Sequence, residues 1–127
     1  MVRAARAQLK RSGAERIQVI RVPGAYEVPL IAARLARFAS SGHNLLQAII
    51  CLGVIIRGET AHAAHIGEAV SRALMDIQVR YEIPVIHEVL LLENERQARV
   101  RCLGKQHNRG TEAAQTALAM AGLLATM

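Results

Sequence analysis

Glutamate and histidine side chains recur at three-residue intervals in RGETAHAAHIGEA (57–69), at Glu59, His62, His65 and Glu68. Residues three apart are neighbours on a helix, so this spacing offers a metal site, a proton-transfer site or a solvated face. The zinc-protease pattern of two histidines four residues apart is absent, and no metal is expected. A solvated face is the preferred interpretation of His65 and Glu68. His62 differs, because it falls where a loop is expected to enter a helix and an imidazole titrates near neutrality.

The loop before His62 has the composition of a phosphate-binding loop. Gly58 lets the backbone approach a ligand closely, and the N–H groups at the start of the following helix favour an anion. A helix cap made by Glu59 or Thr60 explains the same loop without any ligand. The loop alone therefore leaves both interpretations open.

A second cationic cluster lies in RVRCLGKQHNRGTE (99–112), ahead of Glu112. Such a cluster is either a solvated loop or a site where a bound anion relieves the repulsion. Arginine carries a planar fork of donors that suits a phosphate. The basic residues of this segment are Arg99, Arg101, Lys105, His107 and Arg109.

Composition narrows the classes of function. The chain of 127 residues fits one domain, residues 1–127, and 52% of its residues are hydrophobic. No apolar run is long enough to cross a bilayer and no signal peptide is visible, so a cytoplasmic protein without membrane partners is expected. The net charge of +6 favours an anionic ligand. Nucleic acid is not expected, because the only aromatic residues are scattered: Tyr26, Phe38 and Tyr81. Both cysteines, Cys51 and Cys102, are expected to be reduced.

The apolar pattern alternates between helical and strand-like periods along the chain. The strand at 47–56 is expected to be central, because its apolar run is unbroken. The alternation predicts an α/β fold, a three-layer αβα sandwich around a parallel sheet. Unusually for this class, the chain opens on a helix. Further strands are expected at 16–22 and 83–92, and helices at 2–11, from about 27 to 39, from the RGETAH loop to Tyr81, at 93–104 and at 111–125.

Ligands of a parallel α/β sheet gather where its strands end. Four motifs of this chain match a known family in order and spacing. Most of them lie at the ends of the expected strands. The motifs are VPGAYEVP (22–29), GVIIRGETAH (53–62), IPVI (83–86) and RCLGKQHNRGTEAA (101–114). Together they resemble lumazine synthase, the penultimate enzyme of riboflavin biosynthesis, over nearly the whole chain. The resemblance implies a flavodoxin-like fold.

The resemblance also implies a reaction. The family condenses 5-amino-6-(ribitylamino)uracil with 3,4-dihydroxy-2-butanone 4-phosphate to 6,7-dimethyl-8-ribityllumazine, releasing phosphate and water without a metal or an organic cofactor. Its sites lie between adjacent subunits of a homopentamer, and some members assemble into decamers or 60-subunit shells. The amine and the ketone are reactive themselves, so holding them together supplies much of the acceleration.

The roles of individual residues follow from the same resemblance. His62 matches the histidine that assists proton transfer, and Arg101 matches the arginine that a neighbouring subunit brings to the phosphate. Glu112 matches an acidic residue that can orient the histidine. The substrate-binding matches are Gly58, Glu59 and Thr60 in the phosphate loop, Ala25, Tyr26 and Glu27 along the pyrimidine and ribityl chain, Ile55 and Ile56 beside the ring, Lys105 and Arg109 near the site, and His87 where a phenylalanine is common beside the pyrimidine.

Several positions depart from the family pattern. Ala63, Ala64 and His65 replace an aromatic, an acid and an aromatic, and LLLEN replaces a Leu-Thr-Thr stretch. The family's first strand and the loop that supplies a stacking aromatic have no counterpart, so a truncated or mis-started chain is expected. An N-terminally extended form should then be more stable and more active. Two alternatives to the enzyme stay open: a weakened or inactive assembly homologue, and a phosphate-binding regulator.

Overall fold

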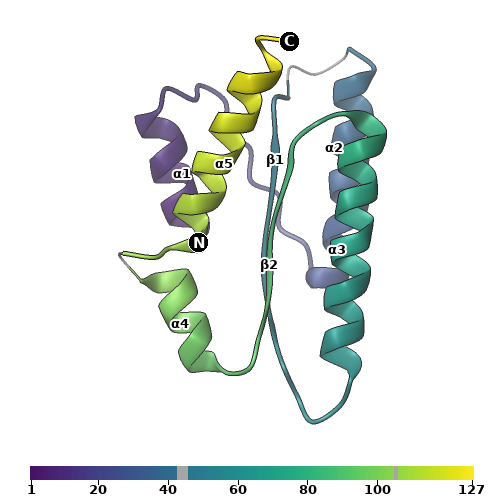
Figure 1. The fold of residues 1–127 in the computed structure, drawn as a ribbon, viewed down its shortest axis with the longest axis vertical. Coiled ribbons are helices and arrows are strands. Elements are labelled where there is room, and N and C mark those ends of the chain that lie inside the picture. Colours follow the sequence, from purple (N-terminus) through teal and green to yellow (C-terminus); the bar gives the residue numbers. More distant parts are fainter. Residues whose placement is uncertain (43–45, 105) are drawn as a thin grey trace.

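Two parallel strands form the sheet of this protein, whose computed structural model describes residues 1–42, 46–104 and 106–127. Strand β1 (Ile49–Ile56) pairs along its whole length with β2 (Val85–Leu92), with Ile49 opposite Val85 and Ile56 opposite Leu92. Because the strands are parallel, their carboxyl ends and the loops that follow lie at the same edge of the sheet (Figure 1).

Helices cover both faces of the sheet (Figure 1). One layer holds α2 (Val28–Ser40) and α3 (His62–Tyr81), with the short 3₁₀ helix η1 (Ala25–Glu27) beside them. The other layer holds α1 (Val2–Arg11), α4 (Glu95–Leu103) and α5 (Arg109–Leu124). The predicted α/β class, with helices on both sides of a parallel sheet, is confirmed.

The larger core lies between the sheet and the layer of α2 and α3. Strand residues alternate between faces, so Cys51, Ile55 and Val89 point into this core, where they meet the fully buried Val70 and Leu74 of α3. A smaller core on the other face is built from Ile86, Ala113 and Ala117. Alanines dominate the contact with α5, and this lets the helix approach the sheet closely.

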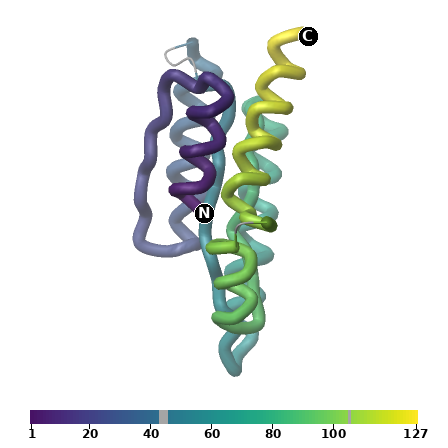
Figure 2. The backbone as a smooth tube through the Cα atoms, turned by 90° about the vertical axis from the view of Figure 1, so that its left-hand side faces the viewer, coloured from purple at the N-terminus to yellow at the C-terminus, as the bar shows by residue number. Residues whose placement is uncertain are grey.

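The strand predicted at 16–22 is absent from the structure. Residues 14–22 form no regular secondary structure, and the side chains of Val19 and Ile20 are more than 40% exposed. The segment runs down one side of the molecule from α1 to η1 (Figure 2). Its alternating pattern favours extended backbone, but a strand must also lie beside another strand, and the described strands β1 and β2 pair only with each other. For the same reason β1 is paired along one edge only and is not central.

The predicted helices are present with shifted ends. Helix α5 begins at Arg109 rather than at 111, because the Oδ1 of Asn108 accepts a hydrogen bond of 3.0 Å from the Gly110 N–H and caps it. The N-cap of α3 is Ala61, so the cap predicted at Glu59 or Thr60 is wrong. At its other end α3 stops at Tyr81, where Glu82 adopts a left-handed conformation with φ of 51° ahead of Pro84.

Cys51 and Cys102 are both free and buried, as expected of reduced cysteines. Burial raises the pKa of the Cys51 thiol to about 12. Among the described residues, no helix combines the length and the apolar character of a membrane-spanning segment.

Candidate active site at the ends of the strands

The loop that follows β1 is tied to the loop that follows β2. The backbone N–H of Arg57 donates to the carbonyl of Leu92 at 2.8 Å, and its guanidinium pairs with Glu93 at 3.0 Å. Glu93 in turn leads to Asn94, whose side chain caps α4 by accepting from the Gln97 N–H at 3.0 Å. The two loops therefore form one connected rim at the carboxyl edge of the sheet.

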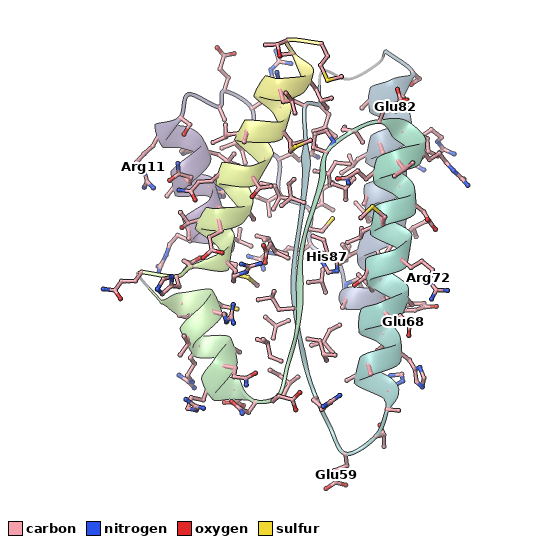
Figure 3. All side chains as sticks on the ribbon, viewed as in Figure 1. Arg11, Glu59, Glu68, Arg72, Glu82 and His87 are labelled. Atoms are coloured by element: carbon pink, nitrogen blue, oxygen red, sulfur yellow. The ribbon has the colours of Figure 1, made fainter. Side chains whose placement is uncertain are left out.

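The residues matched to the phosphate loop lie on this rim and are exposed. Glu59 is at the extreme tip of the molecule (Figure 3). Thr60 Oγ1 accepts a long hydrogen bond of 3.4 Å from the backbone N–H of His62, which begins α3. A Cβ atom built on Gly58 would meet no atom of the described chain within 4 Å, so the backbone there is open to a ligand or a neighbouring molecule.

The residues matched to the pyrimidine and ribityl positions lie in η1, which contacts α2, α3 and β1, and at the end of β1. Ala25 packs on the larger core, whereas Tyr26 and Glu27 in the same short helix are exposed. In β1, Ile55 is buried in that core and Ile56, pointing to the other face, is 40% exposed. We call the residues of this side the histidine half-site: Ala25, Tyr26, Glu27, Ile55, Ile56, Gly58, Glu59, Thr60 and His62.

His87 projects from β2 toward α3 (Figure 3). Its Nε2 lies 2.7 Å from the Oγ of Ser71, and its Nδ1 accepts a hydrogen bond of 3.1 Å from the backbone N–H of Val89. Burial lowers the pKa of His87 below its ordinary value of 6.5, and the charge of Glu88 opposes that effect. Both ring nitrogens are thus engaged inside the chain.

Arg101, Arg109 and Glu112, which we call the arginine half-site, belong to α4 and α5. Arg101 is exposed in the last turn of α4. Arg109 and Glu112 sit in the first turn of α5, where the guanidinium Nη1 donates to Glu112 Oε2 at 2.5 Å. The same guanidinium also pairs with Glu88 on β2, so two carboxylates hold it. Lys105, the other basic residue predicted here, lies outside the described residues.

The two half-sites lie in different layers of the molecule. The histidine half-site belongs to the rim and to the layer of α3, whereas α4 and α5 cover the opposite face of the sheet (Figure 1). The helices that carry His62 and Arg101 therefore cover opposite faces of the sheet within one chain.

The remaining acidic and histidine residues of the 57–69 pattern lie on a solvated helix face. Glu68 forms an exposed ion pair of 2.7 Å with Arg72 one turn along α3 (Figure 3), and His65 is exposed on the same helix. Within the described ranges, no three His, Cys, Asp or Glu side chains converge as a metal site would require.

Three polar residues that contact the candidate site residues or cap their helices are not predicted from the sequence. Ser71 contacts His87, Glu88 holds Arg109, and Asn108 caps α5. Glu88 did carry a signal, because a carboxylate inside the apolar strand IPVIHEVLLL must find a buried partner. Ser71 carried none, since a serine on an exposed helix face is ordinary.

Comparisons with known proteins all identify the same family. A family model described as 6,7-dimethyl-8-ribityllumazine synthase matches residues 1–125. A protein of that name from Stenotrophomonas maltophilia (strain R551-3) is 44% identical over 108 residues, which cover 85% of this chain and 66% of the relative. One from Xanthomonas euvesicatoria pv. vesicatoria (strain 85-10) is 39% identical over 112 residues, covering 88% of this chain and 70% of the relative. The chain thus spans about two thirds of the length of these relatives.

Proposed function

Since the chain belongs to the 6,7-dimethyl-8-ribityllumazine synthase family, we propose that it catalyses that synthesis. The substrates are 5-amino-6-(ribitylamino)uracil and 3,4-dihydroxy-2-butanone 4-phosphate, and the products are 6,7-dimethyl-8-ribityllumazine, phosphate and water. The observation that carries the proposal is the family match over residues 1–125, which includes every residue of both half-sites. Within riboflavin biosynthesis this is the penultimate step.

The active site is formed between two chains. The histidine half-site of one chain faces the arginine half-site of the next, so that His62 and Arg101 share one pocket. The placement of α3 and α4 on opposite faces of the sheet supports this arrangement, because the head-to-tail interfaces of a ring bring two different surfaces of identical chains together. A homopentamer is the assembly that the family resemblance favours.

The roles of the charged groups follow from the chemistry of the bond changes. Departure of phosphate from the butanone carbon chain leaves negative charge on the phosphate, which the guanidinium of Arg101 stabilises together with the backbone at Gly58 and Thr60. Attack of the amine on the ketone and the later loss of water require proton transfers, for which the His62 imidazole is suited. Tyr26, Glu27 and the ring of His87 hold the ribitylaminouracil.

A direct activity assay tests the proposal. The purified chain is mixed with both substrates, and formation of the yellow-green fluorescent lumazine is followed against reactions that lack one substrate. Product formation above the spontaneous rate supports the enzyme. A rate equal to the spontaneous reaction, from a protein that is folded and assembled, contradicts it.

A second candidate is a non-catalytic assembly protein. It is favoured by the segment 14–22, which forms no regular secondary structure. Such a protein would form the ring in analytical ultracentrifugation but give no product. A phosphate-binding regulator would instead bind inorganic phosphate at the RGETAH loop without any condensation.

A further inference from the structure

Glu88 is the one buried charged residue among those that the structure describes, with 6% of its surface exposed. It belongs to β2, and its side chain lies on the side of the sheet covered by α5. Burying a carboxylate is costly unless other groups compensate its charge and satisfy its oxygens. Position 88 of β2 could hold a small apolar residue. The buried carboxylate found there instead indicates a specific role.

The partner of Glu88 is Arg109, the first residue of α5. Arg109 Nε donates to Glu88 Oε2 at 2.9 Å, and Arg109 Nη2 lies 2.8 Å from Glu88 Oε1. This is the two-point fork of a strong arginine–carboxylate pair. Burial alone lowers the pKa of Arg109, but the hydrogen bonds and charge of Glu88, joined by Glu112, outweigh burial and raise the pKa. The guanidinium is thus positively charged, and its donors are taken up by the carboxylates of Glu88 and Glu112.

We call Glu88, Arg109 and Asn108 together the clamp. It reaches from the sheet to the end of α4. Next to Arg109, the Asn108 side-chain amide donates to the carbonyl of Cys102 at 2.9 Å and to that of Gly104 at 3.1 Å. Cys102 follows Arg101 directly. Glu88 is therefore hydrogen-bonded to Arg109, and Asn108, the chain neighbour of Arg109, is hydrogen-bonded to the turn that follows Arg101.

Polar ties matter here because α4 has little apolar anchoring. Cys102 is the only one of its residues that is buried. A helix with a single buried side chain is positioned mainly by its ends and by its hydrogen bonds. At its first end α4 is held by Asn94, and at its last end it is held by Asn108.

We propose, building on the proposed function, that Glu88 is a positioning residue that clamps Arg109 and, through Asn108, sets Arg101 and Glu112 at the arginine half-site. Arg109 then serves as part of the clamp and not as a phosphate ligand. Phosphate affinity depends on Glu88 even though Glu88 is itself an anion and never touches the ligand.

The sign of one substitution separates positioning from simple electrostatics. Removing a negative charge near an anion site strengthens anion binding by Coulomb's law. If Glu88 positions Arg101, Glu88→Gln should instead weaken the binding of inorganic phosphate to the assembled protein, by about 3- to 30-fold in calorimetry. An unchanged or tighter dissociation constant overturns the proposal.

A double-substitution cycle tests the role of Arg109. If Arg109 acts through the clamp, Glu88→Gln, Arg109→Gln and the double variant should weaken phosphate binding to a similar extent. If Arg109 contacts phosphate itself, Arg109→Gln should have a much larger effect than Glu88→Gln, which contradicts the clamp. The double variant leaves no unpaired charge buried, so it supplies the answer even where Glu88→Gln alone does not fold.

Two further measurements test the proposal, and the second of them does not require that the chain makes product. In the product assay, Glu88→Gln should raise KM for the phosphate substrate more than KM for the ribitylaminouracil. The matched control is Glu68→Gln, which removes an exposed carboxylate paired with Arg72 and should leave both constants unchanged. Urea unfolding of the same cycle should show non-additive losses, and additive losses overturn the clamp whether or not the chain makes product.

Discussion

Ser71 Oγ lies 2.7 Å from His87 Nε2, and the surrounding hydrogen bonds fix which of the two donates. The Ser71 hydroxyl gives its own hydrogen to the carbonyl of Gly67 at 2.7 Å, so it accepts from His87. Nδ1 accepts from the Val89 N–H, so it carries no hydrogen. His87 is therefore the neutral imidazole protonated at Nε2, and it presents ring carbons rather than a free donor.

The Ser71–His87 hydrogen bond should be measurable as a coupling. Ser71→Ala loses this bond, worth about 0.5–1.5 kcal/mol, but gains about 0.5 kcal/mol of helix propensity, so the single variant understates it. In a His87→Phe background the propensity gain and the loss of the hydrogen bond to Gly67 remain, and only the bond to His87 is missing. Urea unfolding of the two single variants and the double variant should give a coupling free energy near 1 kcal/mol. Equal effects of Ser71→Ala in both backgrounds would show that the bond contributes nothing.

Folding stability should fall in mildly acidic solution through His87. Its pKa is lowered in the folded chain, so the unfolded chain takes up a proton first as the pH drops. The contribution is fully present above pH 6.5, the ordinary histidine value, and is lost as the pH falls from there through the folded pKa. His87→Phe should reduce the slope of stability against pH in this window, measured by thermal unfolding at fixed ionic strength. An identical slope in the variant would assign the effect to other histidines.

His62→Ala should slow product formation by roughly 10- to 1,000-fold, because general acid–base assistance seldom exceeds about 10,000-fold and positioning of the substrates remains. His62 is exposed at the first position of α3, so the fold should tolerate the change. His65→Ala on the same helix is the matched control and should retain activity. Complete loss of activity with intact circular dichroism would mean that His62 does more than transfer protons.

Arg101→Ala should act on binding of the phosphate substrate. The side chain is exposed and forms no ion pair with the residues that the structure describes, so little stability should be lost. The expected result is a rise in KM for the butanone phosphate with a smaller change in KM for the uracil. Arg99→Ala, which removes an exposed partner of Glu95, is the control. Unchanged affinity for the phosphate substrate would remove Arg101 from this role.

Mixing the two variants tests whether the site is shared. In a ring assembled from equal amounts of His62→Ala and Arg101→Ala chains, about a quarter of the interfaces combine an intact histidine half-site with an intact arginine half-site. Activity should therefore recover to about that fraction of wild type after the variants are dissociated together and reassembled. No recovery, with mixed assembly verified by mass spectrometry, would place the two residues in one chain's site.

The helices and both paired strands could be read from the sequence because apolar periodicity reports local structure and burial together. The segment 16–22 could not, because its alternation specifies extended backbone while pairing depends on a neighbour elsewhere. From the sequence Arg109 is predicted only as a basic residue near the site, since sequence spacing does not reveal that Glu88 of β2 lies against it on the face covered by α5. Glu112, predicted to orient the histidine, holds Arg109 within its own chain, and its role toward a neighbouring chain stays a prediction.

The outer edge of β1 has a practical consequence for handling the protein. Its sequence, IICLGVII, contains no proline or charged residue that would discourage another strand from joining it. Backbone donors and acceptors along that side are a template for intermolecular pairing. Preparations that leave this side uncovered should become turbid as concentration and temperature rise, and a peptide that supplies a matching strand should keep them clear.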